Sequence, residues 1–187
     1  MILAQWDGLG EGLAVDRNGI VYVATRASIA RYTSTGTALP AWPDPDYPDG
    51  VAVDGAGNVF LVGAYPSNLV KKLAHDGAVL TSWGSYGTGA GQFDSPTRAA
   101  VDPSGNVYVV DYGNNRVEIF SNDGAYLGQF GGTGSGPGQF AGPIGIATDA
   151  NGFIYVADAN NNRIQKFGPL PTPTRTSSWG QLKVLYH

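Results

Sequence analysis

The chain of 187 residues contains no cysteine, which excludes a disulfide framework and thiolate chemistry. It has only two histidines, His75 and His187, whereas catalytic zinc sites take several, so we expect no metal and no cofactor. Its 11 Lys and Arg residues are scattered and the net charge is −4, which argues against a nucleic-acid partner. No apolar run is long enough to span a membrane and the first residues do not form a signal peptide, so the sequence predicts neither.

Glycine is abundant, at 28 positions, and it accompanies a repeated pattern of short strands. Each copy holds an apolar strand that ends in Asp, a turn closed by Gly, a strand centred on an aromatic residue, and polar turns into two further strands. The four aspartates, spaced by 38, 48 and 47 residues, are Asp16, Asp54, Asp102 and Asp149. A period in this range built from strands is typical of propeller blades. The sequence therefore predicts an all-β fold, a β-propeller with four-stranded blades.

The repeat pattern divides the chain into two parts. Residues 1–168 form the repeat region, whose copies cover about residues 9–47, 48–94, 95–141 and 142–168. Residues 169–187 form a Pro- and Thr-rich spacer and a short C-terminal segment. The fourth strand of a copy ends in an aromatic residue that follows a leucine by three positions, and such periodic aromatics predict core packing rather than a row that binds sugars.

The third and fourth copies carry residues that resemble a known family. Val101–Val117 reads Val-Asp-x-x-Gly-Asn-Val-Tyr-Val-x-Asp-x-x-Asn-Asn-Arg-Val, and Thr148–Ile164 matches it closely. This pattern resembles the NHL repeat, which forms a propeller blade, and the glycine-rich linkers 87–93 and 134–140 resemble the segment between such blades. The first two copies match more loosely, without the Asn-Asn-Arg run. The resemblance implies an NHL-repeat β-propeller of the kind found in bacterial proteins.

The number of copies leaves ring closure open. Rings of this family usually hold about six blades, and propellers in general about four to eight. Four copies would close a small ring if Ile2–Trp6 supplied the outer strand of the last blade. If Ser177–Gly180 supplied it, the chain would be a partial ring. We favour the partial version of a larger ring, whose open blade edges would promote self-association.

Two ion pairs and four asparagines are the first candidates for a binding face. Asp111 and Arg116 lie five residues apart across the turn between the second and third strands, and Asp158 and Arg163 repeat this spacing. We interpret these pairs first as ion pairs that stabilise the turn and second as a polar rim that binds a ligand. The asparagines, which suit left-handed turn positions, are Asn114, Asn115, Asn161 and Asn162. These turns and the linkers should share one face, and loops on a rigid scaffold are common binding surfaces.

The linker that begins at Trp42 is the most unusual stretch of the chain. Its candidate binding residues are Trp42, Asp44, Asp46, Tyr47 and Asp49. The carboxylates suit a cation and the aromatics suit a sugar. However, an EF-hand-type loop would need a glutamate where Gly55 stands. We interpret the stretch first as a proline-stiffened linker and second as a binding site.

The functional prediction is a non-catalytic binding or scaffold module whose loop-bearing face holds a protein or a cell-surface polymer. No catalytic residue is assigned. One alternative is a metal-dependent hydrolase or lyase whose remaining blades lie outside this sequence. A second alternative is an RNA-binding propeller, which the acidic charge disfavours. The C-terminal segment resembles the tails of some exported bacterial proteins, which favours an extracellular or periplasmic location.

Overall fold

The computed structural model describes residues 10–25, 27–44 and 46–169. These residues form fifteen β-strands and one short 3-10 helix, η1 (Ala159–Asn161). The strand predicted at Ile2–Trp6 and the predicted C-terminal segment lie outside the described residues. Within the described ranges, no helix is long and apolar enough to cross a membrane.

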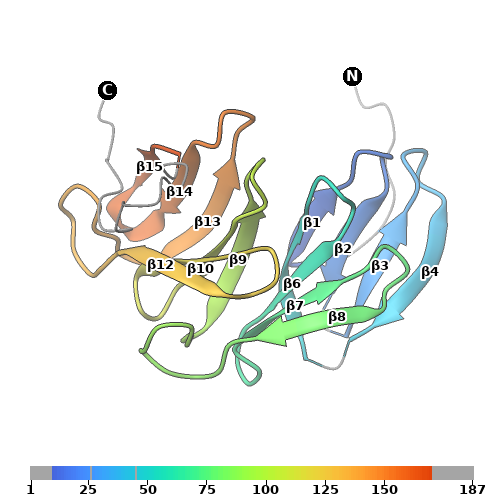
Figure 1. The fold of residues 1–187 in the computed structure, drawn as a ribbon, viewed down its shortest axis with the longest axis horizontal. Coiled ribbons are helices and arrows are strands. Elements are labelled where there is room, and N and C mark those ends of the chain that lie inside the picture. Colours follow the sequence, from blue (N-terminus) through green and yellow to red (C-terminus); the bar gives the residue numbers. More distant parts are fainter. Residues whose placement is uncertain (1–9, 26, 45, 170–187) are drawn as a thin grey trace.

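The strands form four antiparallel sheets, each built from consecutive strands (Figure 1). Blade 1 holds β1 (Gly12–Val15), β2 (Val21–Thr25), β3 (Ser28–Tyr32) and β4 (Ala38–Pro43). Blade 2 holds β5 (Pro48–Val53), β6 (Val59–Gly63), β7 (Leu69–Leu73) and β8 (Val79–Trp83). Blade 3 holds β9 (Pro96–Val101), β10 (Val107–Asp111), β11 (Arg116–Phe120) and β12 (Tyr126–Gly131). Blade 4 holds β13 (Pro143–Thr148), β14 (Ile154–Asp158) and β15 (Arg163–Phe167), with no fourth strand among the described residues. The predicted all-β propeller built of four-stranded blades is confirmed.

The turn between the first and second strands is fixed locally by its aspartate. Oδ1 of Asp54 accepts hydrogen bonds from the backbone N–H groups of Ala56 and Asn58, both at 2.9 Å. The equivalent aspartates of the other three blades accept the same two bonds, as the repeat spacing predicts. Because a slip of one residue would turn every side chain to the opposite face, this turn sets which residues enter the core.

The core lies between successive blades, with one apolar cluster in each of the three junctions. Trp83, on outer strand β8, shows how a junction is closed. Its ring centroid lies 6.3 Å from that of Phe60 in its own blade and 5.7 Å from that of Phe120 in the next. A Cβ atom on Gly124 would lie 2.6 Å from the Trp83 ring, and Gly124 has φ +88°, so glycine is required there. The outer-strand aromatics are therefore packing residues that join blades.

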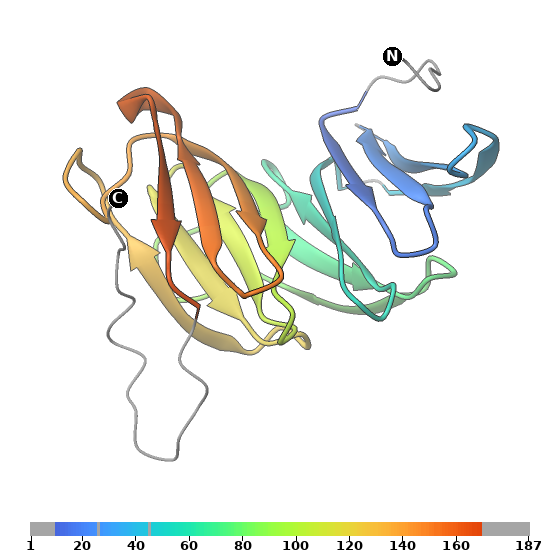
Figure 2. The same cartoon turned by 90° about the horizontal axis from the view of Figure 1, so that it is seen from above.

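The innermost strands β1, β5, β9 and β13 pack in chain order. Blades 1 and 4 lie at opposite ends of the molecule in both views (Figures 1 and 2). Among the described strands, β13 does not make against β1 the packing that joins the other neighbours. The described blades therefore form an open arc.

Candidate functional site

Strand register brings the candidate binding residues to one end of the sheets. In blade 3, Asp111 pairs with Pro96 on one side and with Arg116 on the other. The turn between the second and third strands and the linker to the next blade both leave the sheet at this end. We call this surface the loop face; it comprises linker residues 44, 46–47, 84–95 and 132–142 and turn residues 64–68, 112–115 and 159–162.

Arg116 of blade 3 holds the linker that arrives from blade 2. Its Nε donates to Asp111 Oδ2 at 2.8 Å, and its terminal nitrogens donate to the backbone carbonyls of Thr88, Gly89 and Gln92 at 2.7–2.9 Å. Asn114 adds a bond to the carbonyl of Gly87. We call this set of contacts the linker clasp. It ties the glycine-rich linker to blade 3, and the linker is also closed on itself by an isolated bridge between Tyr86 and Phe93.

Blade 4 repeats the linker clasp with Asp158, Asn161 and Arg163. Arg163 donates to Asp158 Oδ2 at 2.7 Å and to the carbonyls of Ser135, Gly136 and Gln139 at 2.7–2.9 Å. The two buried aspartates respond differently. Burial raises the pKa of Asp111. For Asp158, burial also acts to raise the pKa, but hydrogen bonds from Ala141 N–H, Asn161 and Arg163 outweigh it and leave the pKa lowered. The arginine of blade 4 is also the more exposed of the two.

The second asparagine of each pair connects to the following blade. Asn115 has φ +51°, and its Oδ1 accepts the Gly142 N–H at 2.8 Å. In blade 2, Asn68 has φ +47° and accepts the Ser95 N–H at 2.9 Å. Asn162 of blade 4 has the same backbone conformation, with φ +52°. The left-handed conformation predicted for Asn115 and Asn162 is confirmed, and at Asn115 it comes with a bond to the following blade. The same prediction was wrong for Asn114 and Asn161, which do not have a positive φ; their side chains instead donate to a linker carbonyl and to the aspartate of their own blade.

Glu118 is a buried carboxylate beside the linker clasp that sequence reasoning missed. Its Oε1 lies 3.0 Å from Arg116 Nη2 and accepts the Gly91 N–H at 3.2 Å, while Oε2 has no hydrogen-bond partner. Burial raises its pKa to about 7, although the Arg116 charge and the Gly91 N–H oppose the shift. Blade 4 has Gln165 at this position, whose Oε1 accepts the equivalent Gly138 N–H at 2.9 Å. The only signal in the sequence was the difference between the third and fourth copies, which have Glu118 and Gln165 at this position.

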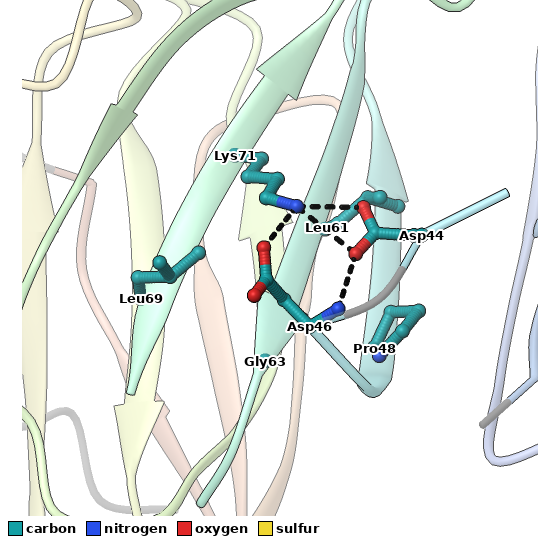
Figure 3. Close-up of a pocket in the computed structure, with 7 residues that line it drawn as sticks. All are labelled: Asp44, Asp46, Pro48, Leu61, Gly63, Leu69 and Lys71. Carbon is teal, nitrogen blue, oxygen red and sulfur yellow. Dashed lines mark hydrogen bonds and ion pairs between the residues drawn. The ribbon is translucent and has the colours of Figure 1, made fainter. Parts of the chain in front are cut away.

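Blade 2 lacks the arginine and uses a lysine instead (Figure 3). Lys71 Nζ lies 3.0 Å from both carboxylate oxygens of Asp44 and also pairs with Asp46. Burial alone would lower the pKa of Lys71, but the hydrogen bonds and charges of Asp46 and Asp44 raise it. Two of the carboxylates that suggested a cation site are therefore already paired with one ammonium group of the protein itself.

We predict that replacing Lys71 by methionine destabilises the protein by about 2–3 kcal/mol, because it leaves the buried Asp44 carboxylate without its charge partner. Thermal melting measures the effect. Millimolar Ca²⁺ should leave the melting temperature of the wild type unchanged, since both carboxylates are already paired. The control is Lys166→Met, which removes a contact with the Phe153 and Tyr155 rings and a positive charge that acts on Asp149, but no buried ion pair. Equal melting temperatures for the two variants would contradict the prediction.

The remaining candidates of this linker occupy different surroundings. Trp42 lies on β4, with its ring centroid 5.7 Å from that of Tyr22 and the Arg31 guanidinium 4.2 Å from its ring. It therefore belongs to the packing between blades 1 and 2. The backbone carbonyl of Asp49 accepts a hydrogen bond from Arg98 at 2.9 Å. Tyr47, in contrast, is 54% exposed on the loop face.

Three further exposed tyrosines lie on the loop face and were not predicted. Tyr65 lies in the second turn of blade 2, Tyr86 in the linker after β8, and Tyr112 next to Asp111 in blade 3. Their exposed fractions are 79%, 68% and 41%. With Tyr47 they make four exposed tyrosines, which we call the tyrosine set. A usable signal was present in the sequence, because each of the three stands in a turn or linker, outside the repeat positions that carry core aromatics.

A shallow pocket of about 440 Å³ at the opposite end of blades 2 and 3 is lined by the turns around Asp54 and Asp102 and by Asn122. The carboxylates of both aspartates already accept hydrogen bonds from protein groups. Among the described residues, no three His, Cys, Asp or Glu side chains are grouped closely enough to hold a metal ion.

Comparison with known proteins identifies the repeats. The NHL repeat family matches residues 93–120 and 140–167, which are the third and fourth copies. NHL repeat-containing protein 3 from Mus musculus is 37% identical over 116 residues, covering 53% of this chain and 33% of that protein. The chain thus spans about a third of this curated relative. The resemblance of these copies to the NHL repeat, noted from the sequence, is confirmed.

Solved structures show the same fold. A protein of unknown function from Bacteroides caccae superimposes with a TM-score of 0.64 at 16% identity, over 84% of this chain and 56% of that one. A streptogramin B lyase superimposes with a TM-score of 0.66 at 16% identity, over 86% and 54%. Virginiamycin B lyase from Staphylococcus aureus gives a TM-score of 0.63 at 16% identity, over 86% and 55%. At this identity the likeness establishes the fold alone. The chain spans just over half the length of these structures.

Proposed function

We propose that this chain, an array of NHL-repeat β-propeller blades, is a non-catalytic binding module that presents its loop face to a protein or a cell-surface polymer. The observation that carries this proposal is the tyrosine set: Tyr47, Tyr65, Tyr86 and Tyr112 are exposed together on one face. Tyrosine is enriched in recognition surfaces because it offers a large apolar ring and a polar hydroxyl at small conformational cost.

The linker clasp supports the proposal by making the loop face rigid. Arg116 and Arg163 each hold three carbonyl groups of a linker, and Asp111 and Asp158 hold the arginines. Ordered loops lose little entropy when they bind a partner. In this proposal the charged candidates hold the loops in shape, and the tyrosines contact the partner.

The proposal is tested with the triple variant Tyr65→Ser, Tyr86→Ser and Tyr112→Ser. The probes are peptides selected from a random phage-display library on the wild type, and purified peptidoglycan. We expect affinity for a bound probe to fall at least tenfold in the triple variant, because one central tyrosine in a contact surface can contribute about 2 kcal/mol. Isothermal titration calorimetry measures the peptides, and sedimentation measures the peptidoglycan.

The matched control is Tyr126→Ser, which alters an exposed tyrosine on outer strand β12, away from the loop face. Its affinity for the probe should stay within twofold of the wild type. If the triple variant binds every probe as tightly as this control does, the loop face is not the binding surface. Failure to recover any probe that binds the wild type specifically would also overturn the proposal.

A further inference from the structure

One short segment of the loop face, Phe93–Ser95, is held by the turns of two neighbouring blades. Asn68 Oδ1, in the turn of blade 2 between β6 and β7, accepts the Ser95 N–H at 2.9 Å. The Gly113 N–H, in the turn of blade 3 between β10 and β11, donates to the Asp94 carbonyl at 2.8 Å. The segment therefore lies where these two turns meet.

The same contacts bring three exposed tyrosines to this segment. Tyr112 directly precedes the glycine of the blade 3 turn, and Tyr65 stands three residues before the asparagine of the blade 2 turn. Tyr86, near the start of the same linker, forms an isolated bridge with Phe93. Three members of the tyrosine set are thus attached to the backbone on either side of Asp94.

The half-buried carboxylate of Asp94 forms no ion pair with a described Lys or Arg side chain. Its Oδ1 accepts a hydrogen bond from the Ser95 hydroxyl at 3.2 Å. A Cβ atom on Gly113 would lie 2.5 Å from Asp94 Cγ, so the carboxylate lies against the turn that carries Tyr112. Asp94 therefore places a negative charge beside the tyrosines, and no described cation of the protein is paired with it.

The fourth copy shows that the blade does not need these side chains. Its linker makes the same isolated bridge and the same linker clasp, and its backbone N–H bond to the blade aspartate is 2.7 Å long in both copies. The residues at the positions of Tyr86, Asp94 and Tyr112 are nevertheless Thr133, Ala141 and Ala159. The two tyrosines and the carboxylate of blade 3 are therefore surface features that the repeat does not require, which favours a role in binding.

We propose that the partner of the loop face is a protein segment with lysine or arginine side chains, whose cationic group binds to Asp94 and contacts the rings of Tyr65, Tyr86 and Tyr112. This inference rests on the proposed function and names the chemistry of the partner. A carboxylate forms charge-assisted hydrogen bonds with an ammonium or guanidinium group. The face of an aromatic ring attracts the same cations.

The charge of the adjoining linker also favours a cationic partner. Asp44 and Asp46 share the single ammonium group of Lys71, so two negative charges and one positive charge leave a net charge of −1 (Figure 3). This linker contacts the turn that carries Tyr65, because the Ser67 hydroxyl donates to the Asp46 carbonyl at 3.0 Å. A partner with anionic groups would be repelled both here and at Asp94.

The test selects peptides from a random phage-display library on the wild type and, in parallel, on Asp94→Asn. Peptides selected on the wild type should be enriched in lysine and arginine relative to the library, and those selected on the variant should not. For a peptide selected on the wild type, isothermal titration calorimetry should show affinity at least about tenfold lower for Asp94→Asn, which keeps the shape of the side chain and removes its charge. Replacing the basic residues of the peptide by glutamine should cause a similar loss. Both changes together should cost little more than either alone, because they remove the same contact.

Two further variants control the experiment. Asp76→Asn removes one negative charge from the turn between β7 and β8, at the opposite end of blade 2, where the carboxylate accepts the Ala78 N–H at 3.0 Å. Its affinity for the peptide should stay within about twofold of the wild type, since charges so far from the site are screened. The triple variant Tyr86→Thr, Asp94→Ala and Tyr112→Ala gives blade 3 the residues of blade 4, so it should fold, which circular dichroism checks, and should lose binding.

The outcomes separate this inference from the proposed function. Selected peptides without enrichment of basic residues, whose binding is lost in the Tyr65→Ser, Tyr86→Ser and Tyr112→Ser variant, would overturn the cationic partner and leave the binding module in place. Specific binding of purified peptidoglycan without any specific peptide would have the same meaning. Recovery of neither would overturn both proposals. Basic peptides that bind Asp94→Asn as tightly as Asp76→Asn would show that Asp94 does not bind the cation.

Discussion

Replacing Arg116 by alanine is expected to destabilise the protein by about 4 kcal/mol or more, the largest effect of any single substitution in the described blades. The change removes the charge partner of Asp111 and Glu118, both fully buried. It also leaves three linker carbonyls without their donor. Breaking a buried ion pair costs about 3–5 kcal/mol, and the lost linker bonds add to this cost. Chemical denaturation, analysed for the free energy of unfolding, measures it.

Two matched variants separate the loss of the positive charge from the loss of the linker hydrogen bonds. Arg116→Lys keeps the positive charge but cannot reach three carbonyls and two carboxylates with one ammonium group, so it should recover only part of the lost stability. Arg163→Ala makes the same change in blade 4, where the arginine is more exposed, so its cost should be smaller than that of Arg116→Ala. A loss in Arg116→Ala no greater than that in Arg163→Ala would show that the clasp between blades 2 and 3 contributes little.

The sequence predicted the arginine pairs but not what they hold. Asp111 and Arg116 lie five residues apart across one turn, so their pairing is visible in a single copy. The carbonyls that Arg116 also binds, those of Thr88, Gly89 and Gln92, lie 24–28 residues earlier in the chain. That contact depends on where the blade 2 linker crosses blade 3, which is set by the packing of the blades. The fold followed from the repeat, whereas the clasp required the tertiary arrangement.

The first two copies show a second limit of sequence reasoning. The absence of the Asn-Asn-Arg run was visible, but its replacement was not, because Lys71 stands two positions after Leu69, which occupies the arginine position in the register of blade 2. Its partner Asp44 comes from a linker that the sequence could place only as a stiff connector. Three members of the tyrosine set, Tyr65, Tyr86 and Tyr112, escaped prediction for a related reason, since exposure depends on whether a neighbouring blade covers a loop. Local patterns do not contain that information.

The second large effect is a change in the pH dependence of stability on replacing Glu118 by glutamine. Burial raises the pKa of Glu118 from its ordinary 4.5 to about 7 in the folded protein. Below about pH 4.5 the carboxyl is protonated in both folded and unfolded states, and its contribution to stability is fully present. As the pH rises through about 7, the unfolded state ionises more readily than the folded state, so this contribution is lost. The difference between these two pKa values corresponds to about 3 kcal/mol.

We therefore expect Glu118→Gln to be more stable than the wild type at pH 8 by up to about 3 kcal/mol and nearly equal to it at pH 4.5. Chemical denaturation at pH 4.5–8.5 measures this difference. Carboxylates whose pKa is lowered, such as Asp158, lose their contribution as the pH falls, so they act in the opposite direction. Their contribution is common to both proteins and cancels in the comparison.

Blade 4 shows why glutamine suits this position. Gln165 Nε2 donates to the carbonyl of Gln139 at 2.7 Å and to Asp158 Oδ2 at 3.1 Å, while its Oε1 accepts the Gly138 N–H. A glutamine at position 118 would meet the same groups of blade 3, so no buried polar atom need stay unpaired. The reverse change, Gln165→Glu, should make stability fall with rising pH in the same way. The loss should be smaller than the one that Glu118 causes in blade 3, because the site in blade 4 is more open. Parallel stability curves for wild type and Glu118→Gln would mean that Arg116 keeps Glu118 ionised throughout this range, and that the ion pair outweighs burial.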